Sequence, residues 1–193
     1  MSETSRALPQ LDVRRHALRE HVLQHSLKTG SFTLKSGRTS KWFLDSKQTA
    51  CRSDGILLVS DVALAILPSE IDAIGGLTMG ADPVAFGIAA VAATRGRTLR
   101  SFSVRKEAKD HGVTGRIAGA LQPGDRVAIV EDTVTRGTSL FEAVEVVRAF
   151  GATPVFITVI VDRGGTCAEM ALKANIKYEP MLTAPDLGYE FGS

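Results

Sequence analysis

Two adjacent carboxylates, Glu131 and Asp132, come directly after an apolar run that is predicted to be a strand. A short loop over residues 133–139, rich in hydroxyl groups and containing Gly137, then leads into a predicted helix. Backbone N–H groups at such a helix start, with hydroxyls nearby and a glycine that permits close approach, can cradle a phosphate. The two acids suit sugar hydroxyls or a magnesium ion. The segment predicts a site for a phosphorylated sugar; solvated acids beside a capped helix are the alternative.

Other phosphate-binding motifs are missing from the sequence. There is no GxxxxGK[ST] loop and no GxGxxG fingerprint. An ATPase or a dinucleotide-binding protein is therefore disfavoured.

Positive charge gathers between residues 95 and 116, where seven basic residues face two acidic ones and the net charge is +5. Within this segment, Arg105, Lys106, Lys109 and His111 precede Gly112 and show no apolar period, so a loop is expected from 106 to 114. Lysine supplies point charge and arginine supplies forked hydrogen bonds, which together suit a polyanion such as pyrophosphate. An exposed charged loop without a ligand is the alternative.

Two further segments carry chemistry at the ends of predicted strands. Residues 32–45 are expected to form a β-hairpin with its turn at Gly37, and this hairpin carries Lys35. Arg163 follows the apolar run 154–161. Each of these cations alone is more readily explained as a surface residue, but together they predict a cationic site for an anionic ligand.

Taken together, these segments resemble the orotate phosphoribosyltransferases, a family of type I phosphoribosyltransferases. Residues 127–139 are similar to the motif that binds 5-phosphoribosyl 1-pyrophosphate (PRPP), and residues 105–112 match the family's RKxxKxHG loop. Residues 32–45 match its N-terminal hairpin and residues 161–165 its Asp-Arg segment. The resemblance thus runs from about residue 32 to residue 163.

The resemblance implies an activity and a set of site residues. The activity is transfer of 5-phosphoribosyl from PRPP to orotate, giving orotidine 5′-monophosphate and pyrophosphate in pyrimidine (UMP) biosynthesis. The implied catalytic residues are Lys109, His111 and Asp132. The implied PRPP-binding residues are Lys35, Arg105, Lys106, Lys109, His111, Glu131, Asp132, Thr133, Val134, Thr135, Arg136, Gly137, Thr138 and Ser139. The implied orotate-binding residues are Lys35, Phe43, Leu44, Thr135 and Arg163.

The same resemblance implies Mg²⁺ as cofactor, held mainly through PRPP and pyrophosphate with no direct protein ligand. It also implies a homodimer in which the loop 105–112 serves the neighbouring active site. One position departs from the family pattern: Met79 stands near a position where a lysine is frequent. That lysine's role is therefore not transferred to this chain, and the sequence gives Arg136 no evident role. The alternatives are a purine phosphoribosyltransferase and a PRPP-sensing regulator that binds nucleic acid.

Alternating helices and strands must position these residues. A first helix is predicted from Asp12 to the break at Gly30, followed by the hairpin. Beyond residue 51, helices are predicted at 55–67, 83–94, 139–150 and 167–174, and strands at 72–77, 98–104, 126–130 and 154–161. This order predicts an α/β fold of the type I phosphoribosyltransferase kind, with a mostly parallel central sheet flanked by helices. Residues 1–193 would form a single domain, with a small N-terminal hood lobe (1–50) and a core (51–193) that includes a C-terminal strand.

Composition sets the outer limits. The chain has 193 residues, of which 44% are hydrophobic and 23% charged, as in a globular protein with a core. The net charge of +2 is too small to favour nucleic acid as a partner, and no window is long and apolar enough to predict a membrane span. Two distant cysteines and a polar N-terminus without a signal-peptide pattern favour the cytoplasm.

Overall fold

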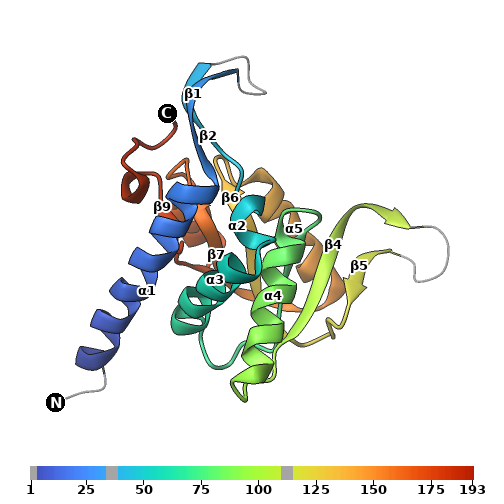
Figure 1. The fold of residues 1–193 in the computed structure, drawn as a ribbon. Helices are drawn as coiled ribbons and strands as arrows, with labels where there is room; N and C mark the ends of the chain where they lie inside the picture. The colour runs from blue at the N-terminus through green and yellow to red at the C-terminus, as the bar shows by residue number, and fades with distance from the viewer. Residues whose placement is uncertain (1–3, 34–38, 110–114) are drawn as a thin grey trace.

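The computed structural model describes residues 4–33, 39–109 and 115–193. A central sheet has the strand order β5-β4-β3-β6-β7-β8 (Figure 1). β9 also pairs with β7, nearer the carboxyl end of that strand than β8 does. Only the β4–β5 pair is antiparallel among the described strand pairs of this sheet. The strands are β3 (Ala73–Leu77), β4 (Arg100–Lys109), β5 (Gly115–Gly119), β6 (Arg126–Val134), β7 (Thr153–Asp162), β8 (Lys177–Tyr178) and β9 (Leu182–Thr183). The predicted mostly parallel α/β sheet is confirmed.

Helices cover both faces of this sheet because its central strands carry apolar side chains on both sides. Along β6, Ala128 and Val130 join one apolar core, and Val127 and Ile129 join the other. The first core packs against α1 (Thr4–His25), α3 (Ser53–Ile66) and α4 (Ala81–Thr94), and the second against α5 (Thr138–Phe150) and α6 (Cys167–Lys173). Burial on both faces is typical of parallel strands and leaves their carboxyl ends as the place for a ligand.

The hood consists of α1 and an antiparallel hairpin of β1 (Leu27–Thr33) and β2 (Thr39–Leu44). The hairpin rises above the core in Figure 1, and the C-terminal tail lies beside its base. The indole of Trp42 on β2 is fully buried, and its Nε1 donates to Ser193 Oγ at 3.0 Å. Between the hood and the core lies the short helix α2 (Lys47–Ala50), and the 3₁₀ turn η1 (Pro185–Leu187) precedes the tail.

Some predicted boundaries were wrong. α1 begins at Thr4 rather than near Asp12 and ends at His25, so Gly30 lies within β1 instead of ending the helix. Strand pairing explains the early end, because Leu27 already pairs with Leu44 across the hairpin. The first strand of the hairpin was also predicted too short, since it starts at Leu27 and not at Phe32.

The segment 106–114 was predicted to be a loop, but β4 includes its first residues, 106–109, and residues 110–114 lie outside the described part of the chain. Lys109 pairs with Gly115 of β5, so the two strands form a ribbon that extends away from the sheet (Figure 1). Lys106, Glu107 and Ala108 are all exposed. A ribbon exposed in this way has no buried side to impose an apolar period, which is why the pattern favoured a loop.

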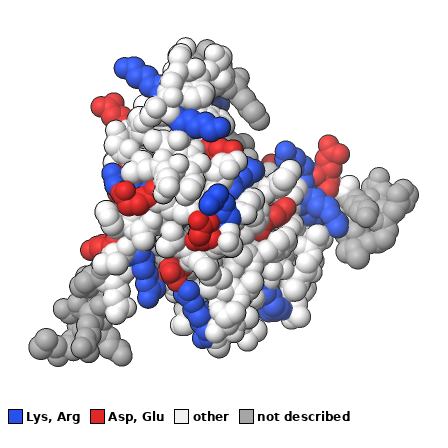
Figure 2. Space-filling model, in the orientation of Figure 1, with Lys and Arg blue, Asp and Glu red and all other residues white. Residues whose placement is uncertain are grey.

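Charges of both signs are distributed over the surface. On the face shown in Figure 2, basic and acidic side chains alternate across the core and gather beside the ribbon. No helix in the described part of the chain combines the length and apolar character that crossing a membrane requires.

Candidate active site

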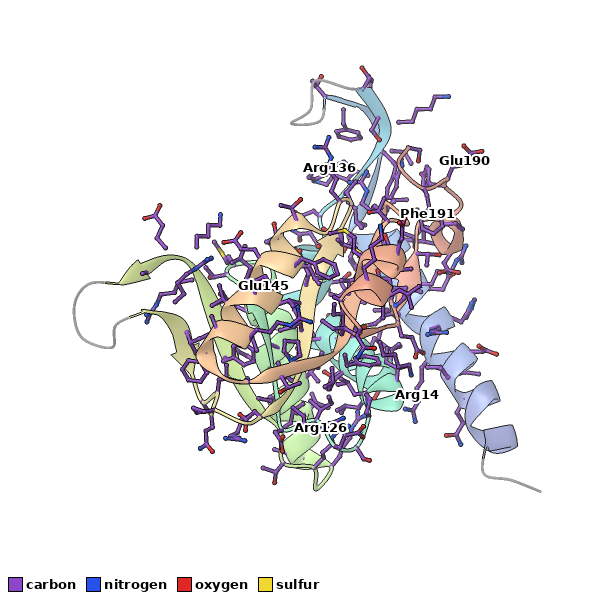
Figure 3. All side chains as sticks on the ribbon, turned by 180° about the vertical axis from the view of Figure 1, so that it is seen from behind. Arg14, Arg126, Arg136, Glu145, Glu190 and Phe191 are labelled. Atoms are coloured by element: carbon purple, nitrogen blue, oxygen red, sulfur yellow. The ribbon has the colours of Figure 1, made fainter. Side chains whose placement is uncertain are left out.

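A cleft of about 1170 Å³ opens at the carboxyl ends of the parallel strands. Segments far apart in the sequence contribute to it: the hairpin, α2, the turn between β3 and α4, β4, the loop from β6 to α5, and the C-terminal tail. Its lining residues are Thr33, Phe43, Leu44, Lys47, Leu77, Thr78, Met79, Gly80, Lys106, residues 131–140, Arg163, Gly192 and Ser193. In Figure 3, Arg136 lies at the foot of the hairpin, at the level of the tail residues Glu190 and Phe191.

The acidic pair forms the floor of this cleft. β6 continues to Val134, so Glu131 and Asp132 lie inside the strand rather than after it, and both are buried. Two neighbours from the start of α2 bind one oxygen of Asp132: Lys47 Nζ lies 2.7 Å from Oδ2, and Ser46 Oγ donates to it at 2.9 Å. The other oxygen accepts the backbone N–H of Thr133 at 2.8 Å. Asp132 is therefore held in one orientation by three donors.

Glu131 differs from its neighbour because it lacks such a set of donors. Burial, and then the negative charge of Asp132, raise the pKa of Glu131 to about 8. The hydrogen bond to Asp132 raises the pKa of Lys47, which keeps this ammonium charged. At neutral pH the floor of the cleft thus combines a protonated glutamic acid, a carboxylate and an ammonium group.

The raised pKa of Glu131 makes stability depend on pH. The unfolded chain ionises Glu131 near pH 4.5 and the folded chain near pH 8, so the free energy of unfolding falls as pH rises between these values. The slope within that window is at most about 1.4 kcal/mol per pH unit. We expect Glu131→Gln to remove this decline in urea unfolding curves measured from pH 5 to pH 8. The exposed Glu190→Gln is the control, and an unchanged decline in Glu131→Gln would contradict the prediction.

The turn from β6 into α5 leaves backbone donors facing the cleft. Gly137 adopts φ +80° at the N-cap of α5, and no side chain caps the helix. The Thr135, Arg136, Thr138 and Ser139 side chains are exposed around it. A helix start without a capping side chain, with its dipole directed at the opening, is suited to binding a phosphate.

Arg163 lines the cleft beside this loop, directly after β7, and its backbone N–H donates to the carbonyl of Val134 at 2.8 Å. Its guanidinium stacks 4.0 Å above the ring centre of Trp42, and Trp42 in turn stacks on Tyr189 with ring centres 4.5 Å apart. Asp162 fixes the turn that follows, because its Oδ1 accepts the N–H groups of Gly164 and Gly165 at 2.9 Å each. Arg163 Nε is buried and has no hydrogen-bond partner among the described residues. This wall therefore offers a cation to a flat anionic ligand.

Close contacts at two glycines join the segments that line the cleft. A Cβ on Gly80 would lie 2.1 Å from Glu131 Oε1, and a Cβ on Gly164 would lie 1.7 Å from the carbonyl oxygen of Thr135. A side chain would clash at either position, so the turn after β3 packs against the acidic pair in β6, and the turn after β7 packs against the loop after β6.

The structure brings most of the residues implied for the site into the cleft: Phe43, Leu44, Lys106, Glu131, Asp132, Thr133, Val134, Thr135, Arg136, Gly137, Thr138, Ser139 and Arg163. Arg105 is not among the lining residues, and its Nη1 donates to the carbonyl of Gly115 within the ribbon at 3.2 Å. Lys35 and His111 lie outside the described residues, and Lys109 is the last described residue of β4. Met79 lines the cleft with 69% of its surface exposed.

Sequence reasoning missed Ser46 and Lys47. They lie at a helix of four residues, which is too short to show a helical period, and nothing in their spacing links them to Asp132. Ser193 was missed for a similar reason, because only the return of the tail to the hairpin brings it to the cleft.

Known proteins are similar to this chain in both sequence and fold. No family model matches the chain. The orotate phosphoribosyltransferase of Streptomyces avermitilis is 38% identical over 182 residues, which cover 93% of this chain and 100% of that protein. This chain belongs to the orotate phosphoribosyltransferase family. The family that the motifs predicted is thereby confirmed, and the similarity extends over nearly the whole length of the chain.

Solved structures of the family show the same fold. A crystal structure of the Mycobacterium tuberculosis orotate phosphoribosyltransferase gives a TM-score of 0.80 at 35% identity, covering 91% of this chain and 99% of that one. The same enzyme in complex with PRPP gives a TM-score of 0.75 at 31% identity, with the same coverage. The predicted type I phosphoribosyltransferase fold is confirmed.

Proposed function

We propose that this chain transfers the 5-phosphoribosyl group from PRPP to orotate, forming orotidine 5′-monophosphate and pyrophosphate in pyrimidine (UMP) biosynthesis. Membership of the orotate phosphoribosyltransferase family supports this reaction. The observation that carries it is the meeting, in one cleft, of the buried acidic pair, the uncapped start of α5 and Arg163. A phosphorylated ribose fits between the first two, and an anionic base fits beside the third.

PRPP would lie along the loop from β6 to α5. The N–H groups and hydroxyls of residues 133–139 bind its 5′-phosphate, and Arg136 adds positive charge at the rim. Asp132 accepts hydrogen bonds from the ribose hydroxyls, and its neighbour Glu131 takes part in the same contact. Lys47 pairs with Asp132 and also lines the cleft, so its ammonium group can contact a phosphate of PRPP.

Orotate would lie against the hairpin and Arg163. Phe43 and Leu44 supply a flat apolar wall, and Thr135 lies where base and ribose meet. The Arg163 guanidinium, already ordered by its stacking on Trp42, pairs with the orotate carboxylate. Lys35 is proposed to contact the base and pyrophosphate, as the family motif implies.

The chemistry needs no protein nucleophile. The base nitrogen attacks the anomeric carbon of PRPP while the bond to pyrophosphate breaks, and positive charge develops on the ribose. The Asp132 carboxylate beneath the ribose stabilises that charge. Lys106, Lys109 and His111 would neutralise the departing pyrophosphate, and His111 can donate a hydrogen bond or a proton to it.

Mg²⁺, a hard cation that prefers oxygen ligands, is proposed as the cofactor. Glu131 is protonated at neutral pH and Asp132 is paired with Lys47, so neither is a free anionic ligand. The ion is therefore held mainly through oxygens of PRPP and pyrophosphate. When bound, it supplies positive charge that neutralises the phosphates.

A homodimer is also part of the proposal, with the ribbon crossing to the neighbouring active site. Lys106 at the base of the ribbon lines the cleft of its own chain. The residues beyond it, from 107 to 112, are therefore the ones proposed to serve the partner.

Two cysteines without a disulfide, Cys51 and Cys167, are consistent with the proposed cytoplasmic location.

Orotate should be consumed at least about tenfold faster than uracil, because only orotate has the carboxylate that pairs with Arg163. The measurement is ultraviolet absorbance of the base in the presence of PRPP and Mg²⁺, with adenine and hypoxanthine as further controls. Equal rates for orotate and uracil, or activity only with a purine, would overturn the proposed function.

A further inference from the structure

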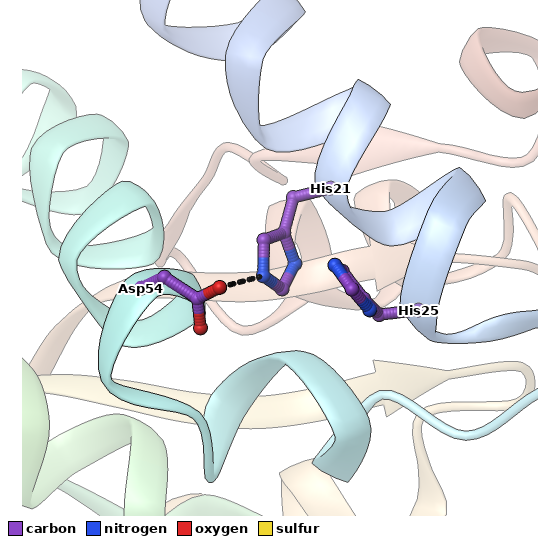
Figure 4. Close-up of side chains that lie close together, drawn as sticks. All are labelled: His21, His25 and Asp54. Carbon is purple, nitrogen blue, oxygen red and sulfur yellow. Dashed lines mark ion pairs between the residues drawn. The ribbon is translucent and has the colours of Figure 1, made fainter.

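A cluster of two histidines and one aspartate lies outside the cleft, where α1 meets the start of α3. His21 and His25 come from α1 and Asp54 from α3, and their side chains converge in Figure 4. One ligand atom from each of the three lies within 4.8 Å of the others. None of the three lines the cleft, so the proposed transfer reaction does not use them.

His21 is held with one ring nitrogen unsatisfied. The side chain is 8% exposed, and Nδ1 lies 3.2 Å from Thr49 Oγ1. Nε2 is buried without a hydrogen-bond partner among the described residues, and Asp54 Oδ2 lies 3.6 Å from it. That separation is too long for a hydrogen bond, and an unsatisfied buried nitrogen costs free energy. The nitrogen points into the cluster.

The ring of His21 is also fixed in place. A Cβ on Gly55 would lie 2.8 Å from His21 Cε1, so only glycine allows the start of α3 to pack this close. The contact with Thr49 at Nδ1 leaves Nε2 for a ligand, the arrangement that orients metal-binding histidines.

His25 and Asp54 complete the set of ligands. His25 lies one helical turn after His21, with ring centres 4.4 Å apart, and two histidines at this spacing share one face of a helix. Asp54 is paired with Arg52, but both side chains of that pair are about half exposed. An exposed pair contributes little to stability, so an ion can replace Arg52 at one carboxylate oxygen.

We propose that His21, His25 and Asp54 bind one divalent transition-metal ion of the zinc class, which joins the hood to the core. Two imidazoles and a carboxylate are ligands that suit Zn²⁺, and a water completes a tetrahedral site. Ligand atoms on a tetrahedral zinc ion are about 3.4 Å apart, so the more exposed His25 and Asp54 must close by up to about 1.4 Å.

The test uses the full chain with Zn²⁺ alone, in buffer without Mg²⁺ or PRPP. Titration calorimetry should give one zinc site, and zinc should raise the midpoint of thermal unfolding because it binds the folded state. Co²⁺ should give the visible absorption of a four-coordinate site. His25→Ala should weaken zinc binding about tenfold or more and abolish the thermal shift. His16→Ala, on the exposed side of the same helix, is the matched control and should behave like the wild type.

Two results would overturn the proposal. One is a zinc affinity in His25→Ala equal to that of the wild type. If Asp132→Asn then abolished zinc binding, the ion would bind in the cleft and not at the histidines. The other is unchanged affinity in Asp54→Asn, because the ion would then not join α1 to α3. Metal-free unfolding curves show whether each variant folds. Orotate consumption by His25→Ala should equal that of the wild type, so failure of the zinc site and failure of the proposed reaction are separately visible.

Discussion

Asp132→Asn should lower kcat for orotate consumption about a hundredfold while changing the KM for PRPP much less. The carboxylate lies at the floor of the cleft and would face the positive charge that develops on the ribose. A preorganised charge of this kind is worth about a hundredfold or more in kcat. The amide keeps the size of the side chain and one oxygen, so hydrogen bonds to the ribose hydroxyls are partly retained in the ground state.

The measurement is steady-state kinetics at saturating orotate with varied PRPP. Asp61→Asn is the matched control, because Asp61 pairs with Arg95 on the surface and does not line the cleft. Its kcat should remain at the wild-type value. Wild-type turnover in Asp132→Asn would show that the carboxylate is not needed for the chemistry. A rise of about a hundredfold in the KM for PRPP with unchanged kcat would contradict the proposed stabilisation of charge. Asp132 would then act only in binding.

The contrast between Glu131 and Asp132 follows from their neighbours rather than from their positions in the motif. Three donors bind Asp132, whereas burial and the adjacent negative charge raise the pKa of Glu131 to about 8. One negative charge at this site, rather than two, limits repulsion between the acids. The sequence shows two acids side by side, but only the packing of α2 against β6 makes them different.

The central strands could be predicted from the sequence because their surroundings are uniform. The apolar runs at 126–130 and 154–161 are buried on both faces, and β6 and β7 indeed start within one residue of the predicted positions. The prediction ended this strand at residue 130 because the next two residues, Glu131 and Asp132, are polar, and polar residues usually mark the end of a strand. In the structure β6 continues to Val134. The buried Asp132 is bound by Ser46 and Lys47, which are about 85 residues away in the chain.

The parts that could not be predicted are those whose structure depends on distant contacts. The pairing of Leu27 with Leu44 turns the chain from helix to strand earlier than its helical pattern indicates. The β4–β5 ribbon is held by its own pairing and by Arg116, whose Nε donates to the carbonyl of Arg105 at 2.7 Å. Neither contact leaves a periodic signal in the sequence. The order of the motifs along the chain was nevertheless enough to predict which loops meet at one end of the sheet.

The proposed dimer leads to a test that joins two inactive chains into one active site. The ribbon projects from the core in Figure 1, and Lys109 lies on its β4 strand. If residues 107–112 serve the partner, each active site takes Asp132 from one chain and Lys109 from the other. Lys109→Ala and Asp132→Asn should each be nearly inactive alone. Lys106 is left unchanged in both variants because it lines the cleft of its own chain.

Mixing Lys109→Ala with Asp132→Asn under conditions of subunit exchange should restore about a quarter of the wild-type activity. With random pairing about half of the dimers are hybrids, and a hybrid has both changes in one site and an intact second site. Mixing two samples of the same variant is the control and should restore nothing. If the ribbon served its own chain, every site would keep one defect and the mixture would stay inactive. Size-exclusion chromatography must show a dimer, and a fully active monomer would rule out the shared site.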